Sequence, residues 1–382
     1  MDIYLDCNAT TPTAPEVLEQ MLPFFGERFG NAASSHVRGR AASAAVERAR
    51  EQVAGLVGVE PSRVVWTSGS TESLNTALKG LADTRGSRST LLVATAEHKA
   101  VLDVADWLAQ RRGVTVQQVP VNGDGLVAEE QLREHLTDDV FAVAVMAANN
   151  EVGTLQAIDK VADAAREVGA HFVCDTTQAA GKVPLTVSDD AFGTVSAHKL
   201  YGPQGVGALI LPTRGRDAAD ALLHGGGHER GVRSGTLNVP GIVGFGVACE
   251  LALQALPSEQ VRLAVLRDQL EAGLAKRLDG VAVHGGGAPR LPNTTNVHIA
   301  GVDADALIVN TPQVAFSSGS ACTAAVPTPS HVLTAMGVAV AEAEESVRLS
   351  VGRFTTMEEV DAAVELLAAS ALRVRDLNEV SA

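Results

Sequence analysis

The sequence predicts an α/β fold with a large unit built on a mostly parallel sheet and a smaller α+β unit after it. Up to about Gly246, short apolar runs that are too brief for helices alternate with segments of helical periodicity. The apolar runs are continuous, as expected for strands that helices cover on both faces. After Gly246 longer helical patterns take over, and the later strand-like runs alternate as half-buried strands do.

The elements of the first part follow one another in a regular alternation. Segment 41–57 predicts an amphipathic helix, because apolar residues recur at helical spacing with charged residues opposite them. After it we expect a strand at 64–67, a helix at 72–79, a strand at 91–94, a helix at 101–109, strands at 114–119 and 140–146, and a helix at 157–168. Two further buried strands are expected at 172–174 and 194–197, and polar residues follow both.

The second part predicts two long helices, at 248–256 and 261–278, and a half-buried strand at 296–299. A last helix is expected at 357–377. We place a domain boundary within the pair of long helices. The large domain is then 13–252, and the small domain combines 1–12 with 253–382.

Composition narrows the possible partners. Of the 382 residues 46% are hydrophobic and 3% aromatic, so Ala, Val and Leu must build the core. The formal charge of −15 argues against nucleic acid or an anionic membrane as the main partner. We find no apolar run of bilayer-spanning length and no signal pattern at the start, so we expect a cytoplasmic protein. The widely separated cysteines suit reduced thiols, without a disulfide framework or a zinc site.

An acid and a lysine follow the two short strands at 172–174 and 194–197. Asp175 ends the first, and Lys199 follows the second, just before a glycine-rich turn. Groups at the ends of neighbouring buried strands can grip opposite sides of one planar cofactor. Pyridoxal 5′-phosphate needs a lysine for its Schiff base and a carboxylate on its pyridinium nitrogen. Each residue alone also fits a plainer role, a helix cap for Asp175 and a solvated loop for Lys199, but the pair favours the cofactor.

Further polar groups follow the other strands. Ser68-Gly69-Ser70-Thr71 precedes a helix, whose N–H groups and dipole favour a phosphate, although an ordinary capping box reads the same way. His98 and Asn149 follow two more strands. Ligands of open α/β sheets bind at the carboxyl edge, so we expect these groups to converge there with Asp175.

Reactive and charged groups of the second part complete the candidates. Cys322 lies in a run of small polar residues and is the best candidate for a nucleophile. Cys174 and Cys249 have apolar neighbours and are expected in the core, whereas the polar neighbours of Cys7 do not exclude it as a nucleophile. Arg348 or Arg353 could clamp a substrate carboxylate, and we favour Arg348; the alternative is a surface ion pair. The spaced histidines of the glycine loop at 224–228 lack a third ligand, so we expect no metal.

Taken together, the motifs resemble one enzyme family over nearly the whole chain. They read YLDCNATTP, TSGSTES, EHKAVL, NNEVGTLQ, CDTTQAAGKVP, SAHKLYGPQGVGAL, GGGHERGVRSGTLN, SSGSACTA and RLSVGRFTT. In this combination and order they look like a cysteine desulfurase of the class V aminotransferase group, among the fold-type I pyridoxal-phosphate enzymes. The SSGSACT segment resembles the subgroup with a long catalytic loop. The resemblance implies a seven-stranded sheet in the large domain.

The resemblance also implies a reaction, in which L-cysteine gives L-alanine and an enzyme persulfide that passes to a sulfur acceptor. Lys199 would form the Schiff base and move the Cα proton, Asp175 would pair with the pyridinium nitrogen, and the Cys322 thiolate would attack the substrate sulfur. Gln178 would bond the ring phenol oxygen, and His98 would stack on the ring and assist proton transfer. The phosphate would be held by Ser70, Thr71, Ser196 and His198 with Thr236 of the partner subunit, and the substrate carboxylate by Asn149 and Arg348, Asn149 also contacting the cofactor.

The expected partners are L-cysteine, a second copy of the chain in a homodimer, and a sulfur-acceptor protein. The sequence ends at LRVRDLNEVSA, whereas housekeeping members continue into a tail that docks the iron–sulfur scaffold. This favours a dedicated acceptor, in tRNA thiolation, cofactor synthesis or DNA sulfur modification. Two alternatives remain: an aminotransferase, lyase or epimerase that does not use Cys322, and a catalytically silent sulfur-relay subunit.

Overall fold

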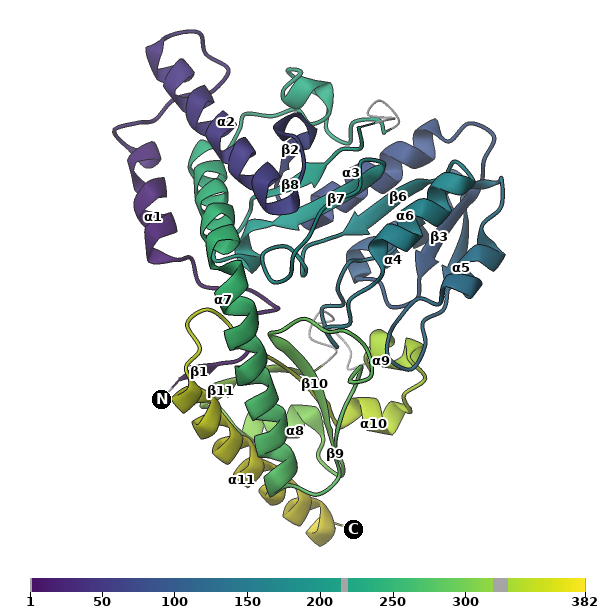
Figure 1. Ribbon diagram of the computed structural model, residues 1–382, viewed down its shortest axis with the longest axis vertical. Coiled ribbons are helices and arrows are strands. Elements are labelled where there is room, and N and C mark those ends of the chain that lie inside the picture. The colour runs from purple at the N-terminus through teal and green to yellow at the C-terminus, as the bar shows by residue number, and fades with distance from the viewer. Residues whose placement is uncertain (1, 214–218, 319–328, 382) are drawn as a thin grey trace.

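The computed structural model describes residues 2–213, 219–318 and 329–381, with the side chains of 378–381 left aside. It shows a large upper unit and a smaller lower unit, joined by one long helix (Figure 1). Both chain termini lie in the lower unit.

Within the described residues, seven strands form the central sheet in the order β2-β8-β7-β6-β5-β3-β4. They are β2 (Val64–Thr67), β3 (Thr90–Ala94), β4 (Thr115–Val119), β5 (Val140–Ala144), β6 (His171–Asp175), β7 (Ala191–Ser196) and β8 (Gly207–Ile210). β8 pairs antiparallel with both of its neighbours, whereas the pairings from β7 through β6, β5 and β3 to β4 are parallel. The predicted seven-stranded, mostly parallel sheet is confirmed.

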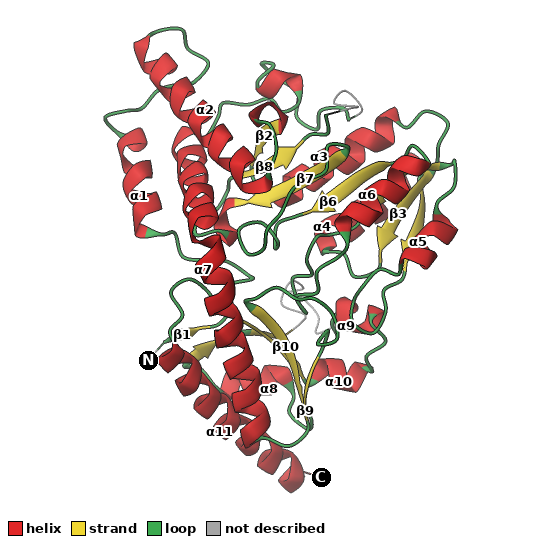
Figure 2. Ribbon diagram, in the orientation of Figure 1, coloured by secondary structure: helices red, strands yellow, loops and turns green. Residues whose placement is uncertain are grey.

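Helices cover both faces of this sheet (Figure 2). One face carries α2 (Val37–Val57), α5 (Glu129–His135), α6 (Ile158–Glu167) and the first half of α7 (Val239–Arg277), and the other carries α3 (Ser70–Thr84) and α4 (Lys99–Arg112). Alternate side chains of a strand serve the two cores: Val64 and Trp66 pack under α2 and α7, and Val65 packs under α3. Burial on both faces explains why the strands read as continuous apolar runs.

The smaller unit has its own antiparallel sheet and its own core. The sheet order is β12-β13-β10-β9, with β9 (Val281–Val283), β10 (Thr294–Ile299), β12 (Ser317–Ser318) and β13 (Ser346–Ser350). A short parallel pair joins β1 (Ile3–Tyr4) to β11 (Val314–Ala315), so the N-terminus belongs to this unit. Its helices are α8 (Ala304–Asn310), α9 (His331–Ala335), α10 (Val340–Glu344) and α11 (Met357–Ser381), whereas α1 (Pro15–Met21) packs on the core of the large unit.

The prediction of two long helices at 248–256 and 261–278 is wrong, because a single helix, α7, spans Val239–Arg277 with Pro257 inside it. Proline removes one backbone hydrogen bond and usually breaks a helix. Here the helix continues because its first half packs on α1 and α2 and its second half on α11. The sequence boundary at 252/253 falls inside this helix, so the domain limits stay a proposal.

Length and composition alone would allow α7, among the described residues, to cross a membrane. Its packing shows a different role, because buried residues such as Phe245, Ala248 and Leu270 lie in the cores of both units. The helix is therefore a core element that ties the two units together (Figure 1).

Candidate active site

A cleft of about 580 Å³ lies at the carboxyl edge of the parallel strands, between the two units. Its lining brings together Ser70, Thr71, His98, Asp175, Gln178, Ser196, His198, Lys199 and Arg348. Most of the side chains expected to form the site therefore share one space. Residues of the N-terminal segment, including Asp6 and Asn8, complete the wall.

Asp175 ends β6 with its two carboxylate oxygens in different settings. Oδ1 accepts hydrogen bonds from the Thr177 backbone N–H at 3.0 Å, the Thr177 hydroxyl at 2.5 Å and the Thr194 hydroxyl at 2.9 Å. These bonds fix the carboxylate plane and leave Oδ2 for the cleft. A carboxylate held in this way is suited to bond a protonated ring nitrogen.

Lys199 follows β7 at the end of the 3₁₀ turn Ala197–Lys199. Its Nζ donates to the backbone oxygens of Asn8 at 2.5 Å and Ala9 at 2.7 Å. Two residues later Tyr201 adopts φ 63°, a left-handed conformation that is strained for an aromatic residue. This bend turns the chain back directly after the lysine, so the amine faces the cleft.

The N-terminus of α3 forms another wall of the cleft. The helix begins at Ser70, and its N-cap is Gly69 at φ +154°, with no side-chain capping bond. The simple serine cap considered from the sequence is therefore wrong. Ser70 Oγ lies 2.5 Å from the Thr177 hydroxyl, within the shell around Asp175. An uncapped helix start lined with hydroxyls suits an anionic group such as a phosphate.

Two histidines line the cleft in neutral form. His98 caps α4, and its Nδ1 accepts from the Ala100 N–H at 3.1 Å, which places the proton of the neutral ring on Nε2. Burial lowers the pKa of His98. Burial and the nearby Lys199 and Lys182 lower the pKa of His198 to about 4. The Nδ1 of His198 lies 3.1 Å from the Thr10 hydroxyl.

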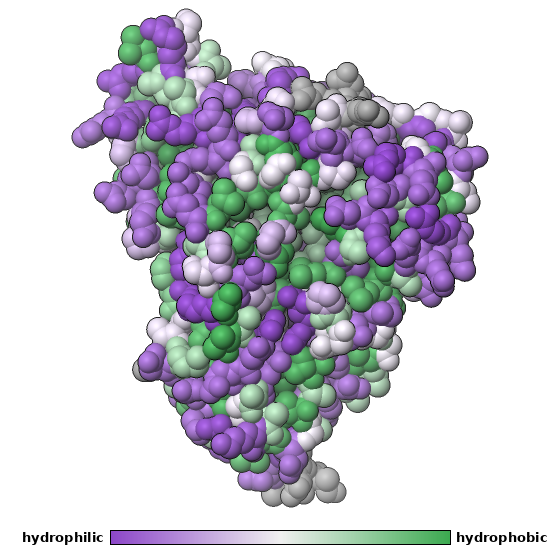
Figure 3. Space-filling view, in the orientation of Figure 1, coloured by the Kyte–Doolittle hydropathy of each residue, from purple (hydrophilic) through white to green (hydrophobic). Residues whose placement is uncertain are grey.

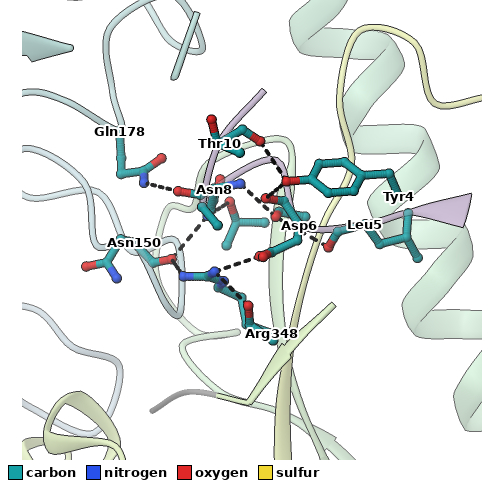
Figure 4. A network of polar contacts seen from close by, with 12 residues as sticks. Tyr4, Leu5, Asp6, Asn8, Thr10, Asn150, Gln178 and Arg348 are labelled. Carbon is teal, nitrogen blue, oxygen red and sulfur yellow. Dashed lines mark hydrogen bonds and ion pairs between the residues drawn. The ribbon is translucent and has the colours of Figure 1, made fainter. Parts of the chain in front are cut away.

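Arg348 comes from the central strand β13 of the small sheet and points toward the large unit (Figure 4). Its guanidinium donates to Asp6 Oδ1 at 2.7 Å, to the Asn150 backbone oxygen at 3.2 Å and to Ser317 Oγ at 3.2 Å. Its Nε is buried and has no hydrogen-bond partner among the described residues. Arg348 lines the cleft, and a guanidinium there is suited to bind a carboxylate.

Arg353, the alternative clamp, is committed elsewhere. It donates twice to Glu259, at 2.9 and 3.2 Å, and stacks over Tyr201 with 4.6 Å from its central carbon to the ring centroid. It does not line the cleft. The geometry thus supports the preference for Arg348.

Two expected site residues are absent from the lining of the cleft, and a third lies outside the described residues. The Asn149 side chain is buried below it, where it donates to the Ala96 oxygen and accepts from the Glu151 and Val152 N–H groups; its neighbour Asn150 lines the cleft. Thr236 is absent from the lining of this single chain. Cys322 lies outside the described residues. The roles of all three stay predictions.

The described cysteines are poor nucleophiles. Cys7, Cys174 and Cys249 are buried, and burial raises the pKa of Cys7 to about 11. Burial also raises the thiol pKa of Cys174 and of Cys249. A thiolate is the reactive form, so none of the three suits attack at neutral pH. The core placement expected for Cys174 and Cys249 is confirmed.

Sequence reasoning missed the contribution of the N-terminal segment and of Lys182. Gln178 donates to the Asn8 backbone oxygen at 3.0 Å, and its Oε1 accepts from Lys182 Nζ at 2.5 Å (Figure 4 shows the Asn8 contact). The YLDCNATTP motif marked this segment as part of the family pattern, but the spacing of its residues did not predict that the segment lies at the cleft. Lys182 lies in the CDTTQAAGKVP motif, but nothing in that motif predicted its contact with Gln178.

Comparison with known proteins agrees with this geometry. Residues 3–363 match the family model of the class-V aminotransferases, and the chain belongs to that family. It is 48% identical to a cysteine desulfurase IscS of Anaeromyxobacter sp. (strain Fw109-5), over 99% of this chain and 94% of that one. A NifS-like protein superposes with a TM-score of 0.87 at 36% identity, covering 97% of this chain and 99% of that one. SspA in complex with cysteine gives 0.82 at 34% identity, covering 93% and 100%. The resemblance to cysteine desulfurases is thus confirmed.

The donor set of the cleft fits pyridoxal 5′-phosphate. An amine, Lys199, and a carboxylate, Asp175, face one space, as the aldehyde and ring nitrogen of this cofactor require. The helix start at Ser70 and the hydroxyl of Ser196 offer donors to a phosphate. His98 adds a neutral imidazole to the same wall.

Proposed function

We propose that this protein is a pyridoxal-phosphate-dependent cysteine desulfurase, which removes sulfur from L-cysteine, releases L-alanine and carries the sulfur as a persulfide. The observation that carries the proposal is the cleft that Lys199, Asp175 and Arg348 line together. The first two groups suit the cofactor, and the third suits the carboxylate of an amino acid. The relative named cysteine desulfurase and the neighbour that binds cysteine support the same activity.

When bound, the cofactor withdraws electrons from the substrate and so makes bonds at its α carbon easier to break. Lys199 anchors the cofactor and is the amine placed to take and return the Cα proton. Asp175 holds the ring nitrogen, with Oδ1 fixed by its hydroxyl partners. His98 supplies a neutral imidazole whose Nε2 proton can be shared with the site.

Sulfur transfer requires a thiolate, and we assign it to Cys322. The thiolate attacks the substrate sulfur and forms an S–S bond. The electron pair of the broken C–S bond stays on the substrate carbon, which takes a proton and becomes the methyl group of alanine. Arg348 orients the substrate by its carboxylate. Its partner Ser317, shortly before Cys322 in the sequence, lies in the same cleft wall.

We further propose a cytoplasmic homodimer that passes its sulfur to an acceptor protein. Large apolar side chains at one end of the large unit support self-association. Leu22, Phe25, Phe29 and Val37 are 58%, 67%, 58% and 71% exposed. In a dimer Thr236 of the partner subunit would reach the phosphate. The acceptor belongs to iron–sulfur assembly, tRNA thiolation, cofactor synthesis or DNA sulfur modification.

Replacing Cys322 tests the proposal against a lyase or transaminase on the same fold. The Cys322→Ala enzyme should keep its yellow colour, because Lys199 and Asp175, which would hold the cofactor, are unchanged. It should lose at least about a hundredfold in alanine formation from L-cysteine, since no described cysteine can substitute. Full alanine production by this variant would contradict the proposed desulfurase activity. A colourless wild-type protein after incubation with the cofactor would instead favour a silent sulfur-relay subunit.

A further inference from the structure

A second buried lysine lies behind the site and has no role so far. Lys182 is 8% exposed, and its Nζ donates to Gln178 Oε1 at 2.5 Å and to Asn8 Oδ1 at 3.4 Å. Both acceptors are neutral amide oxygens. A buried cation without a carboxylate partner is costly, and burial lowers the pKa of Lys182 to about 7. A purely structural lysine is more often exposed or paired with an acid.

The contact with Lys182 decides which way the Gln178 amide points. An amide has one oxygen and one nitrogen at its end, and the two are exchanged by a flip. The charged form of Lys182 has three donors and no acceptor, so Oε1 faces it while the amine is protonated. The nitrogen then bonds the Asn8 backbone oxygen at 3.0 Å with one hydrogen. Its second hydrogen is left for the cleft, which Gln178 lines.

The same backbone oxygen also links Lys182 to the reactive lysine. Asn8 O accepts from both Gln178 Nε2 and Lys199 Nζ, the latter at 2.5 Å. The side chain of Asn8 is in turn held by Asn293 Nδ2 at 3.0 Å on its Oδ1. Lys182, Gln178, Asn8 and Lys199 therefore form one connected network, and fixing one end restrains the rest.

We propose that Lys182 is a positioning residue that holds the Gln178 amide with an N–H toward the phenol oxygen of the bound cofactor. The inference rests on the proposed function, because it assumes that pyridoxal 5′-phosphate occupies the cleft. Lys182 itself touches neither cofactor nor substrate, and it acts through Gln178. Without it, only the Asn8 backbone oxygen holds the amide in this orientation, and a flip that presents the amide oxygen to the phenolate becomes easier.

The test combines Lys182→Met with Gln178→Ala in a double-mutant cycle. Two quantities are measured: the dissociation constant of the apoprotein for pyridoxal 5′-phosphate, and the pH midpoint of the visible absorbance of the holoenzyme. Lys182→Met should weaken cofactor binding about tenfold and shift the midpoint, as loss of one oriented hydrogen bond predicts. In the Gln178→Ala background the same change should add less than about twofold. Lys160→Met, at an exposed lysine paired with Glu129, should leave both quantities unchanged.

Additive effects of Lys182→Met and Gln178→Ala would overturn the inference, as would a Lys182→Met holoenzyme with wild-type affinity and absorbance. If Lys182→Met fails to fold, Lys182→Gln provides the test. An amide at this position can turn an acceptor as well as a donor toward Gln178, so the midpoint should shift in a folded protein. An unshifted midpoint in that variant would contradict the proposal.

The cycle also separates this inference from the proposed function. A protein that binds the cofactor and shows the coupled shift, but makes no alanine from L-cysteine, would keep Lys182 in its role and end the desulfurase. A protein that makes alanine without coupling between Lys182 and Gln178 would support the desulfurase and overturn the role proposed for Lys182. Failure to bind the cofactor at all would overturn both.

Discussion

Arg348 shows how a single residue can connect the two units at the cleft. It stands in the small sheet, yet its partners include Asp6 from the N-terminal segment and Asn150 from the large unit (Figure 4). Asp6 balances its charge, and the side chain is almost fully buried. A substrate carboxylate entering here would meet a guanidinium that these partners hold in place.

Arg348→Lys is expected to raise the KM for L-cysteine roughly ten- to hundredfold, because lysine lacks the planar fork and the Nε donor. The visible absorbance of the holoenzyme should not change, since Arg348 serves the substrate. Steady-state alanine formation measures the effect. Arg353→Lys is the matched control: it weakens the contact with Glu259 and should leave KM within about twofold. Equal KM values for wild type and Arg348→Lys would remove Arg348 as the clamp.

Glu97 lies buried next to the site, and burial raises its pKa to about 8. Its Oε1 accepts from the Met146 N–H at 2.5 Å, and its Oε2 is buried with no partner in the part of the chain that the structure describes. Folding therefore favours the protonated acid. Between the ordinary value of 4.5 and about 8 the folded state binds more protons than the unfolded state, so this residue makes stability fall as the pH rises.

Glu97→Gln should remove that dependence. The difference in unfolding free energy, variant minus wild type, is expected to rise with pH by up to about 1.4 kcal/mol per unit across this window. Urea denaturation at pH 5, 6, 7 and 8 measures this difference. Gln is chosen because it keeps the size of the side chain and has an N–H donor where the protonated carboxyl group has its O–H. A constant difference over the series would show that Glu97 is ionised in the folded protein.

At this scale, the sequence located residues better than it oriented side chains. Asp175, His98 and Lys199 could be predicted because each directly follows a buried strand, and the carboxyl ends of parallel strands share one edge. The same reasoning chose Asn149, but the backbone turn sends its amide inward and places Asn150 at the cleft. Which of two adjacent side chains faces a ligand depends on dihedral angles that no spacing reports.

Among the elements, α3 and β8 meet where the phosphate is expected. A Cβ at Gly207 of β8 would lie 2.6 Å from the Gly69 Cα and 2.6 Å from the Val195 backbone oxygen. Backbone atoms cannot move aside as a flexible side chain can. Gly207 thus permits the turn before α3 to approach the sheet and sets the position of the helix start.

Gly207→Ala should push this turn away from the sheet and weaken binding of pyridoxal 5′-phosphate about tenfold, because a small displacement of oriented donors is costly. Equilibrium titration of the apoprotein measures the affinity. Gly26→Ala is the control, since a Cβ there meets nothing within 4 Å. Unchanged affinity in Gly207→Ala would mean that the turn does not hold the phosphate.

The elements themselves were predicted well where periodicity is strong and local. The strand predicted at 64–67 coincides with β2, and the others differ by few residues at their ends. The helix α7 was divided at Pro257 because sequence reasoning sees the missing hydrogen bond and not the helices packed on either side. The short helix α5 (Glu129–His135) was missed, since Leu132 is its one buried residue.

For the whole molecule, the cleft depends on how the two units meet. The cores are separate, but α7 belongs to both. The segment that follows β1 crosses from the small unit and contacts Lys199 through the backbone oxygens of Asn8 and Ala9. On the face shown in Figure 3, hydrophilic residues cover much of the surface, while hydrophobic ones gather near the middle.

The long-range parts of this arrangement could not be predicted from spacing. Pairing of β1 with β11 joins segments about three hundred residues apart, and loop closure over such a length leaves no local pattern. The resemblance to a known family supplied what periodicity could not, namely the number of strands in the sheet and the role of Gln178 at the cofactor ring.

The most direct test of the central claim is mass spectrometry of the purified holoenzyme after brief exposure to L-cysteine without reductant. We expect one added sulfur on the peptide that contains Cys322, together with an equal amount of L-alanine. The Cys322→Ala variant, treated in parallel, should carry no added sulfur. Alanine or pyruvate released without sulfur on Cys322 would contradict the desulfurase and point to a lyase or transaminase built on the same cleft.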